Sequence, residues 1–423
     1  MVTKLQKIIS KIEKRHSKKI DLSLDRTFNL LSKLGNPQNK IKNVVTVVGT
    51  NAKASMATAL STILKESGYK YNLYTSPHLQ SYTERFVFNN EEIDENNLAI
   101  LLEDIDRILG NDNATVFEIL TCAFIKYAER FKDNVNIIEA GLFHRFDSTN
   151  VFKQNLLTLL GVIHLDHLNW LDNKTIDGVI YEKTSSLPIS NIFVNNQMNS
   201  EIKTKIKKSL TNNKSKKYFF GDDFNVAKSE NSFIHYQDEL GEIMLPQPNL
   251  IGDHQIYNIS TSIAASRKIF NISDANIKNS MKKMRLKGRL EEIKSGKLKN
   301  TAGNNKLVID GGHNISASIA IANWVKNQNV EVNLIVGMMK DKEHVEFIKN
   351  FRNIVNSITL IDIPNQDGAI SKEDLKKKLD NLNLNLKLSN GIEESIKSLS
   401  KNENTIILCI GSLYLAGEIL SLN

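Results

Sequence analysis

The run of residues 44–55, VVTVVGTNAKAS, constrains the fold more than any other stretch of the chain. Its first five residues are apolar or β-branched, which is the pattern of a parallel strand covered on both faces. Gly49 permits a tight turn after the strand. From Ser55 onward apolar residues recur at helical spacing until Gly68, a typical helix stop. The sequence therefore predicts a buried strand, a glycine loop and a helix.

This junction is typical of phosphate-binding loops. The first N–H groups of a helix are unpaired and the positive end of its dipole faces the loop, so a bound anion is stabilised there. Lys53 would neutralise phosphate charge, and Ser55 would coordinate Mg²⁺. The spacing departs from the Walker pattern because Ala54 separates the lysine from the hydroxyl. An ordinary strand–helix turn with an exposed lysine and a serine N-cap is the alternative.

Composition and charge limit the classes of protein to be considered. A chain of 423 residues has room for two or three domains, and 41% hydrophobic with 24% charged residues is typical of a globular protein. The net charge of +8 suits acidic small substrates and also a nucleic-acid surface. The lysine-rich run of residues 203–217 lacks interleaved aromatic residues, so we interpret it as the solvated face of a helix over residues 201–217.

Cysteine usage and the amino terminus bear on the compartment. Only two cysteines occur, Cys122 and Cys409, so neither a disulfide framework nor a cysteine metal cluster is indicated. The amino-terminal residues are basic and amphipathic and lack the apolar core of a secretion signal. No run approaches the roughly 20 apolar residues of a membrane span. We therefore expect a cytoplasmic monomer that binds neither a membrane nor nucleic acid.

Polar side chains stand where two further apolar runs end. VNIIEAGL predicts a buried strand ending at Glu139, and LLTLLGVIHLDH predicts a strand ending at Asp166 and His167. A carboxylate at the end of a parallel strand is unexpected for packing and expected at a ligand crevice. Together with Ser55, Glu139 and His167 offer a hydroxyl, a carboxylate and an imidazole for Mg²⁺. A histidine taken alone here is more commonly a structural or surface residue.

The carboxy-terminal part alternates apolar strands with helical stretches. Its strands are NKLVIDGGHN, EVNLIVGMM, SITLIDI and TIILCIG, and such alternation is typical of a mostly parallel α/β domain. None of them is followed by GxGxxG, so a dinucleotide is not indicated. The predicted fold is α/β, with a P-loop-type, mostly parallel ATPase domain over residues 1–287 and a smaller Rossmann-like domain over residues 288–423.

Several motifs resemble those of folylpolyglutamate synthases and dihydrofolate synthases, members of the Mur ligase superfamily. GTNAKAS is similar to the family's GTNGKGS, TSPHL…ERF to TSPHL…ERI, EAGLFHRFDSTNV to EVGLGGRLDATNV, and the EKTSS run to EKAGI. GDHQIYN, GRLE and DGGHN resemble GxHQxxN, GRLE and DGAHN, so the resemblance covers nearly the whole chain. Alanine replaces two loop glycines at Ala52 and Ala54, and Phe143-His144 replaces Gly-Gly. If Ala52 has a positive φ, the missing glycine costs about 1–2 kcal/mol.

The resemblance implies a site assembled from these motifs. It assigns catalytic roles to Lys53, His167 and Lys183, the last as a carbamate; by residue pattern alone Lys183 is a solvated helix lysine. The other implied contacts are Gly49, Thr50, Asn51, Ala52, Lys53, Ala54, Ser55, Asn258, Arg289, Asp310 and His313 with ATP; Ser55, Ser76, Glu139 and His167 with the metal; and Arg85, Thr115, Val116, Phe117, Glu118, Phe146, Asp147 and Ser148 with the acidic, pterin-linked substrate.

The implied activity is an amide ligation that uses ATP as co-substrate and Mg²⁺ as cofactor. A pterin-linked carboxylate attacks the γ-phosphate, and the amino group of L-glutamate attacks the resulting acyl phosphate. Dihydropteroate and reduced folates are the implied acceptors. Three alternatives stay open: an enzyme that only extends folates, a Mur-type ligase for a cell-wall nucleotide precursor, which would need a further amino-terminal domain, and a nucleotide-binding homologue without catalysis, suggested by Ala52 and Ala54.

Overall fold

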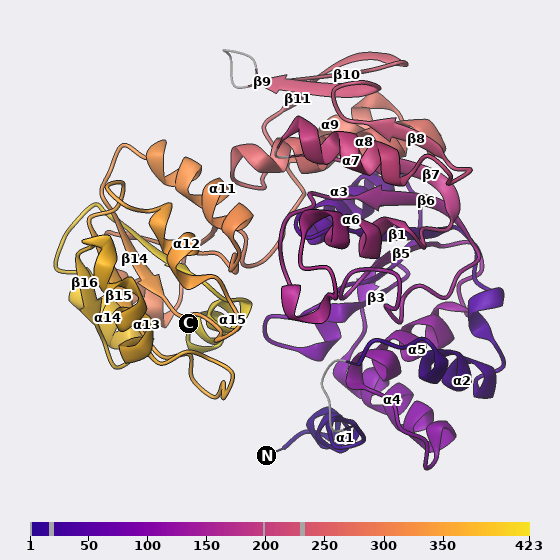
Figure 1. Ribbon diagram of the computed structural model, residues 1–423, viewed down its shortest axis with the longest axis horizontal. Coiled ribbons are helices and arrows are strands. Elements are labelled where there is room, and N and C mark those ends of the chain that lie inside the picture. Colours follow the sequence, from indigo (N-terminus) through magenta and orange to yellow (C-terminus); the bar gives the residue numbers. More distant parts are fainter. Residues whose placement is uncertain (1, 17–20, 198, 229–232) are drawn as a thin grey trace. The chain divides into compact units, whose positions relative to one another are not determined.

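The computed structural model describes residues 2–16, 21–197, 199–228 and 233–423. Within these ranges the chain forms two compact units, one from residues 1–249 and 256–284 and the other from residues 250–255 and 285–423 (Figure 1). Both units combine helices with a mostly parallel sheet, which confirms the predicted α/β class. The sequence also predicted that two domains meet at Lys287–Gly288, and this domain boundary stays a prediction.

The first unit is built on a large, mostly parallel sheet with strand order β4-β3-β2-β5-β1-β6-β7-β8. The central strand β1 is buried along its whole length and lies between β5 and β6, where Val47 pairs with Glu139 and Leu159. The carboxyl ends of these three strands therefore meet at one edge. The strands are β1 (Val44–Val48), β2 (Tyr71–Tyr74), β3 (Phe86–Phe88), β4 (Glu91–Glu92), β5 (Val135–Glu139), β6 (Gln154–Leu160), β7 (Ile189–Val194) and β8 (Lys216–Phe219).

Helices pack on the large sheet, and α3 (Lys53–Glu66) starts directly after the β1 loop. Ser262 of α8 (Asp253–Ile269) donates a hydrogen bond to the Met56 carbonyl at 2.9 Å, which fixes α8 against α3. Gly68 follows α3 with φ 81°, as expected of a helix stop. The other helices of this unit are α1 (Lys4–Glu13), α2 (Asp25–Lys33), α4 (Glu95–Leu109), α5 (Val116–Ala128), α6 (Ile176–Thr184), α7 (Ser200–Ser209) and α9 (Asp274–Met281), with short 3-10 turns at Pro37–Asn39, Tyr82–Arg85 and Leu168–Trp170.

A small antiparallel sheet extends the first unit beyond β8. It consists of β9 (Phe224–Lys228), β10 (Phe233–Asp238) and β11 (Gly241–Pro246), with β10 in the middle. Asp238 of β10 forms a nearly buried ion pair with Arg267 of α8 at 3.1 Å. This pair connects the small sheet to the helix that packs on α3.

The second unit contains a sheet of order β12-β13-β17-β14-β15-β16, parallel except for β12. The alternation of strands and helices predicted for this part is confirmed. The strands are β12 (Glu291–Ile293), β13 (Lys306–Ile309), β14 (Val332–Val336), β15 (Ser357–Leu360), β16 (Leu386–Leu388) and β17 (Ile406–Ile410); the helices are α10 (Lys297–Ala302), α11 (Ile315–Lys326), α12 (His344–Lys349), α13 (Lys372–Leu379), α14 (Ile392–Leu399) and α15 (Leu413–Leu422), with a 3-10 turn at Asp380–Leu382. Among the helices of the described residues, none is long and apolar enough to cross a membrane.

Two predicted elements were too long. The strand expected to reach Asp166 and His167 ends at Leu160, because from Gly161 onward the chain leaves the sheet to bind the β1 loop. The helix expected over residues 201–217 ends at Ser209, and Lys216 already belongs to β8. Thr211, Asn212 and Asn213 are poor helix formers, which accounts for the early end of this helix.

Candidate active site

The loop between β1 and α3 is fixed to the segment that follows β6. The N–H groups of Thr50 and Asn51 donate to the Val162 carbonyl at 2.9 and 3.1 Å. The Thr50 hydroxyl donates to the His164 carbonyl at 3.0 Å and accepts from its N–H at 3.1 Å. Gly161 leaves room for the loop, because a Cβ there would lie 2.4 Å from the Asn51 carbonyl oxygen. Sequence reasoning missed Gly161, although a glycine directly after an apolar run was a visible signal.

Ala52 has the backbone conformation that favours glycine. Its φ is 75° and it is the N-cap of α3, without a side-chain hydrogen bond to the helix. An L-residue in this left-handed region is strained by contact between its Cβ and the backbone. The loop therefore has a conformation here that suits glycine, and the methyl group of Ala52 is strained in it.

We expect Ala52→Gly to raise the free energy of unfolding by about 0.5–1 kcal/mol. Relief of about 1–2 kcal/mol of strain exceeds the entropy that glycine adds to the unfolded chain. Urea denaturation measures the change, and Ala54→Gly is the matched control, because Ala54 lies inside α3 and glycine there lowers stability by up to about 1 kcal/mol. Catalytic activity should be equal or higher. A marked loss of activity would show that the loop has adapted to alanine.

Two lysines meet at the carbonyl of Gly49. Lys53 donates to it at 3.1 Å and to the Thr50 carbonyl at 3.3 Å, and Lys183 of α6 donates to it at 3.1 Å. Lys183 is buried, unlike the solvated lysine that its sequence context alone indicates. Burial, with the positive charge of Lys53, lowers the pKa of Lys183 to about 7. The neutral amine is therefore far more accessible near neutral pH than that of an exposed lysine.

Glu139 provides a buried carboxylate beside the loop. It is the last residue of β5, and the N–H of Ala140 donates to the Val47 carbonyl at 3.0 Å, so Glu139 lies next to the end of β1. The Ser76 N–H donates to Glu139 Oε2 at 3.4 Å. Two of the predicted metal contacts are thus brought together.

His167, the third predicted metal contact, lies across the ring of Phe143. The two rings meet edge to face, with their centres 6.4 Å apart. The backbone N–H of His167 donates to Asp166 Oδ1 at 2.9 Å. In the described residues, histidine, cysteine and acidic side chains do not gather in groups of three that could hold a metal ion. A metal here would need hydroxyl, water and phosphate oxygens as further ligands, as Mg²⁺ does.

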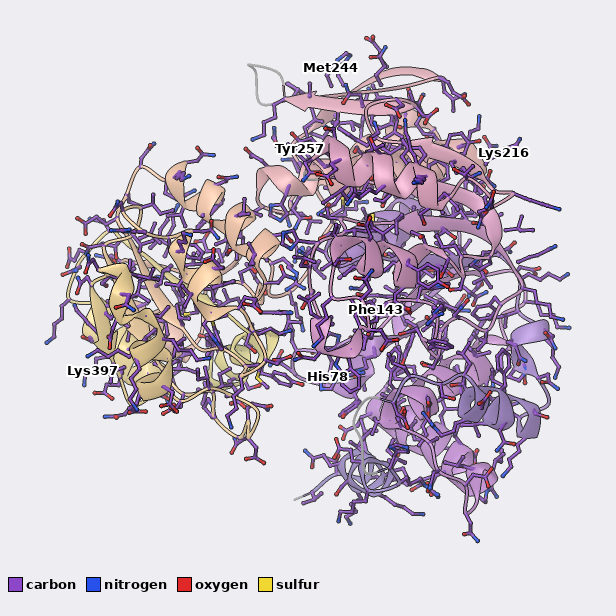
Figure 2. The ribbon with its side chains drawn as sticks, in the orientation of Figure 1. His78, Phe143, Lys216, Met244, Tyr257 and Lys397 are labelled. Atoms are coloured by element: carbon purple, nitrogen blue, oxygen red, sulfur yellow. The ribbon has the colours of Figure 1, made fainter. Side chains whose placement is uncertain are left out.

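Phe143 and His144 border the buried amine of Lys183. Phe143, labelled in Figure 2, has φ 56°, a second position where the motif's glycine has been replaced in a glycine-like conformation. The Lys183 Nζ lies 5.3 Å from the centre of its ring. The His144 side chain is fully buried, and its Nδ1 lies 3.0 Å from Ser186 Oγ.

Some of the predicted substrate contacts have partners within the protein. Arg85 donates from Nε to His78 Nδ1 at 2.9 Å, and its guanidinium lies 5.1 Å from the centre of the Tyr82 ring; His78 is labelled in Figure 2. Thr115 and Glu118 form the capping box of α5, and Val116 packs against the apolar core. Arg26 donates to Glu118 at 2.8 Å, so this carboxylate already has a cationic partner.

Two of the remaining predicted substrate contacts, Phe117 and Ser148, lie near Tyr74. Phe117 stacks on Tyr74 at 6.0 Å between ring centres. Ser148 Oγ lies 3.0 Å from Thr121 Oγ1, whose hydroxyl donates to the Tyr74 hydroxyl at 3.3 Å. Asp147 accepts from the Leu142 N–H at 2.7 Å; burial raises its pKa despite this hydrogen bond. Phe146 is 39% exposed and lies under the Arg145 guanidinium, 4.3 Å from the ring centre.

The predicted ATP contacts of the second unit form a local cluster of their own. Asp310 is buried and accepts from the N–H groups of Gly312 at 2.6 Å and Leu290 at 2.8 Å. Burial raises the pKa of Asp310, and the positive charge of Arg289 opposes that rise. His313 Nδ1 lies 3.0 Å from the Gly311 carbonyl oxygen. Asn258 belongs to the first unit, where it accepts from Asn195 Nδ2 at 2.8 Å.

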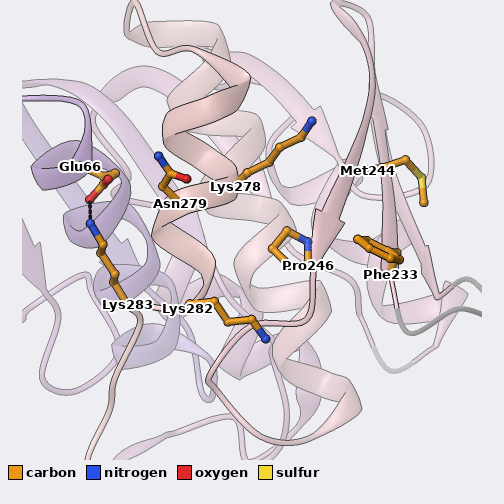
Figure 3. Close-up of a pocket in the computed structure, with 8 residues that line it drawn as sticks. All are labelled: Glu66, Phe233, Met244, Pro246, Lys278, Asn279, Lys282 and Lys283. Carbon is orange, nitrogen blue, oxygen red and sulfur yellow. Dashed lines mark hydrogen bonds and ion pairs between the residues drawn. The ribbon is translucent and has the colours of Figure 1, made fainter.

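A surface hollow of about 730 Å³ lies away from these residues. Its lining includes Glu66 together with residues of β10, β11 and α9 (Figure 3). Glu66 is the last residue of α3 and Lys53 is the first, so the length of the helix separates the hollow from the loop. Glu66 is also paired with Lys283 at 2.6 Å. The hollow therefore contributes nothing to the site.

One buried histidine, His144, and two partly buried ones, His78 and His254, predict acid sensitivity. Burial lowers the pKa of His144 to about 3 and those of His78 and His254 to about 4. Because unfolded histidine has a pKa near 6.5, the unfolded state binds more protons between pH 6.5 and these values. Stability is therefore fully present above pH 6.5 and falls as the pH drops toward 4. Urea denaturation across this range measures the loss of unfolding free energy. The loss should be smaller in His254→Leu than in wild type. It should be unchanged in His235→Leu, which alters a half-exposed position.

Three comparisons with known proteins found similar sequences and structures. Residues 292–422 match the family model described as dihydrofolate synthetase, C-terminal domain. The dihydrofolate synthase/folylpolyglutamate synthase of Bacillus subtilis is 29% identical over 421 residues, which span 94% of this chain and 94% of that protein. The fold of FolC from E. coli, solved in complex with DHPP and ADP, matches with a TM-score of 0.85 at 23% identity over 99% of this chain and 97% of that one.

A second solved structure gives the same result. It is a bifunctional folylpolyglutamate synthase/dihydrofolate synthase from Yersinia pestis complexed with AMPPNP and a Mn ion. Its TM-score is 0.85 at 21% identity, and the match covers 99% of this chain and 97% of that one. The similarity thus extends over both units of the fold.

Proposed function

We propose that this chain, which is similar over nearly its whole length to dihydrofolate synthases and folylpolyglutamate synthases, adds L-glutamate to dihydropteroate, forming dihydrofolate, and to reduced folates. The reaction is an ATP-dependent carbon–nitrogen ligation through an acyl phosphate. The observation that carries this proposal is the meeting of Lys53 and the buried Lys183 at the Gly49 carbonyl, within a phosphate loop that keeps its glycine-like turn at Ala52.

The β1 loop is proposed to hold the phosphates of ATP. The N–H groups at the start of α3 face the loop, and Lys53 can turn from the Gly49 carbonyl toward phosphate oxygens. Related structures contain ADP or AMPPNP, which agrees with this assignment. Asn258, Arg289, Asp310 and His313 stay proposed ATP contacts.

The donor set around Glu139 fits Mg²⁺. Magnesium keeps several waters and uses one or two carboxylates together with phosphate oxygens. The Glu139 carboxylate, beside the Ser76 backbone N–H, would supply one such ligand, and Ser55 and His167 stay proposed ligands. When bound, the ion would neutralise charge on the transferring phosphoryl group. The Mn ion in the related structure with AMPPNP agrees with a divalent metal.

Lys183 is proposed to act as a carbamate. Its neutral amine attacks CO₂, the new N–C bond replaces one N–H bond, and the proton leaves to solvent. The product is an anion in place of a cation at the Gly49 carbonyl, next to Lys53. Such an anion would orient Lys53 and take part in binding the metal.

Incorporation of labelled glutamate tests the function. The purified protein is incubated with ATP, Mg²⁺ and either dihydropteroate or a tetrahydrofolate monoglutamate. Label in both products is the expected result, label in the folate product alone would restrict the activity to chain extension, and label in neither would overturn the proposal. Nucleotide binding measured on the same sample distinguishes a non-catalytic homologue from a damaged preparation. We further propose that the protein acts as a cytoplasmic monomer.

A further inference from the structure

His144 carries a buried polar atom that the fold leaves unsatisfied. Its side chain is fully buried, and Nδ1 is engaged with Ser186 Oγ at 3.0 Å. Within the described part of the chain, Nε2 is buried and has no hydrogen-bond partner. Buried polar groups are nearly always hydrogen-bonded, so an orphaned atom of this kind indicates a missing partner.

The missing partner belongs in the region of Lys183. Phe143, the neighbour of His144 in the chain, lies with its ring centre 5.3 Å from Lys183 Nζ. Ser186, which binds the other nitrogen of His144, follows Lys183 by three residues, just beyond the end of α6. Phe143 has a φ of 56°, and strained backbone of this kind is concentrated at functional sites.

The unmodified lysine does not satisfy His144. The Lys183 amine donates to the Gly49 carbonyl at 3.1 Å rather than to the imidazole. A neutral imidazole has one donor and one acceptor nitrogen. When Nδ1 accepts from the Ser186 hydroxyl, Nε2 carries the proton and requires an acceptor. An amine offers only donors while it is protonated, whereas a carbamate on the same nitrogen brings two acceptor oxygens.

We propose that His144 is a positioning residue that donates a hydrogen bond from Nε2 to a carbamate oxygen on Lys183. The inference rests on the proposed function, in which CO₂ adds to the neutral amine of Lys183 and one proton is released. His144 holds the planar carbamate in one orientation, and Ser186 holds the imidazole. The similar motif EVGLGGRLDATNV has glycine where this chain has His144.

Carbamate formation on the intact protein tests the role of His144. The probe is ¹³C-bicarbonate, and ¹³C NMR of wild type, His144→Leu, His144→Gln and Ser186→Ala measures the concentration that gives half occupancy. Leucine fills the space but cannot donate, so we expect this concentration to rise about tenfold or more, the effect of losing one hydrogen bond to a charged group. Gln should retain part of the donor, and Ser186→Ala should have an intermediate effect.

Two controls separate this role from a merely structural one. Thermal unfolding without bicarbonate should show that His144→Leu is about as stable as wild type, because leucine removes an unsatisfied buried atom. Unchanged half occupancy in His144→Leu would overturn the inference, and so would a rise in His144→Gln as large as that in His144→Leu. If wild type ligates glutamate but forms no carbamate, the carbamate and the role of His144 both fail while the ligase function stands. If carbamate forms without ligation, the proposed function fails and the role of His144 is still measured.

Discussion

Lys183→Met is expected to lower kcat about 100- to 1,000-fold without unfolding the protein. Methionine keeps the length and apolar stem of lysine but offers neither an amine for CO₂ nor a charge beside the Gly49 carbonyl. Loss of one preorganised electrostatic group in a buried site typically lowers kcat by a factor of this size. Steady-state kinetics with saturating ATP and acceptor measures the loss, and Lys183→Ala should lose as much activity with an added cavity.

The stability of Lys183→Met distinguishes a catalytic lysine from a structural one. The folded pKa of about 7 lies below the unfolded value near 10.4, so burying the charged amine destabilises the wild type fully below pH 7. This penalty disappears as the pH rises from 7 toward 10.4. The variant should therefore be more stable than wild type at pH 6, with the difference shrinking in alkali. Lys208→Met on the exposed face of α7 is the control and should change neither property. Full activity in Lys183→Met would exclude a catalytic role.

Local sequence was sufficient wherever a feature depends on one segment. The β1–α3 unit, the stop at Gly68 and the α/β alternation of the second unit followed from periodicity and glycine placement. Ala52 belongs to this group, because its positive φ follows from the turn that the motif requires.

Features that depend on tertiary contacts were not predictable. Lys183 lies on a helix of mixed polarity, and only the packing of α6 against the β1 loop makes it buried. His144 appeared merely as a departure from a glycine motif, and its unsatisfied nitrogen exists only in the folded core. The strand expected to end at Asp166 was too long for the same reason, since residues after Leu160 bind a loop more than one hundred residues earlier in the chain.

Gly161→Ala is expected to weaken ATP binding at least about tenfold and to lower the free energy of unfolding by about 1–3 kcal/mol. The new Cβ would lie 2.4 Å from the Asn51 carbonyl oxygen and 3.0 Å from Met56 Cε. The first of these atoms is backbone and cannot rotate away, so the loop must shift. A shift would break the hydrogen bonds from Thr50 and Asn51 to the Val162 carbonyl, which hold the phosphate-binding N–H groups in place.

Gly368→Ala is the matched control for Gly161→Ala. Its Cβ would meet only the flexible end of Met339, at 3.0 Å, and Gly368 is exposed. Isothermal titration with ADP and urea denaturation of both variants separate the effect of backbone crowding from that of losing a glycine. If Gly161→Ala bound ADP as tightly as wild type, the loop would be free to move without cost. Nucleotide affinity would then depend on Lys53 and the amino terminus of α3 rather than on the hydrogen bonds from Thr50 and Asn51 to the Val162 carbonyl.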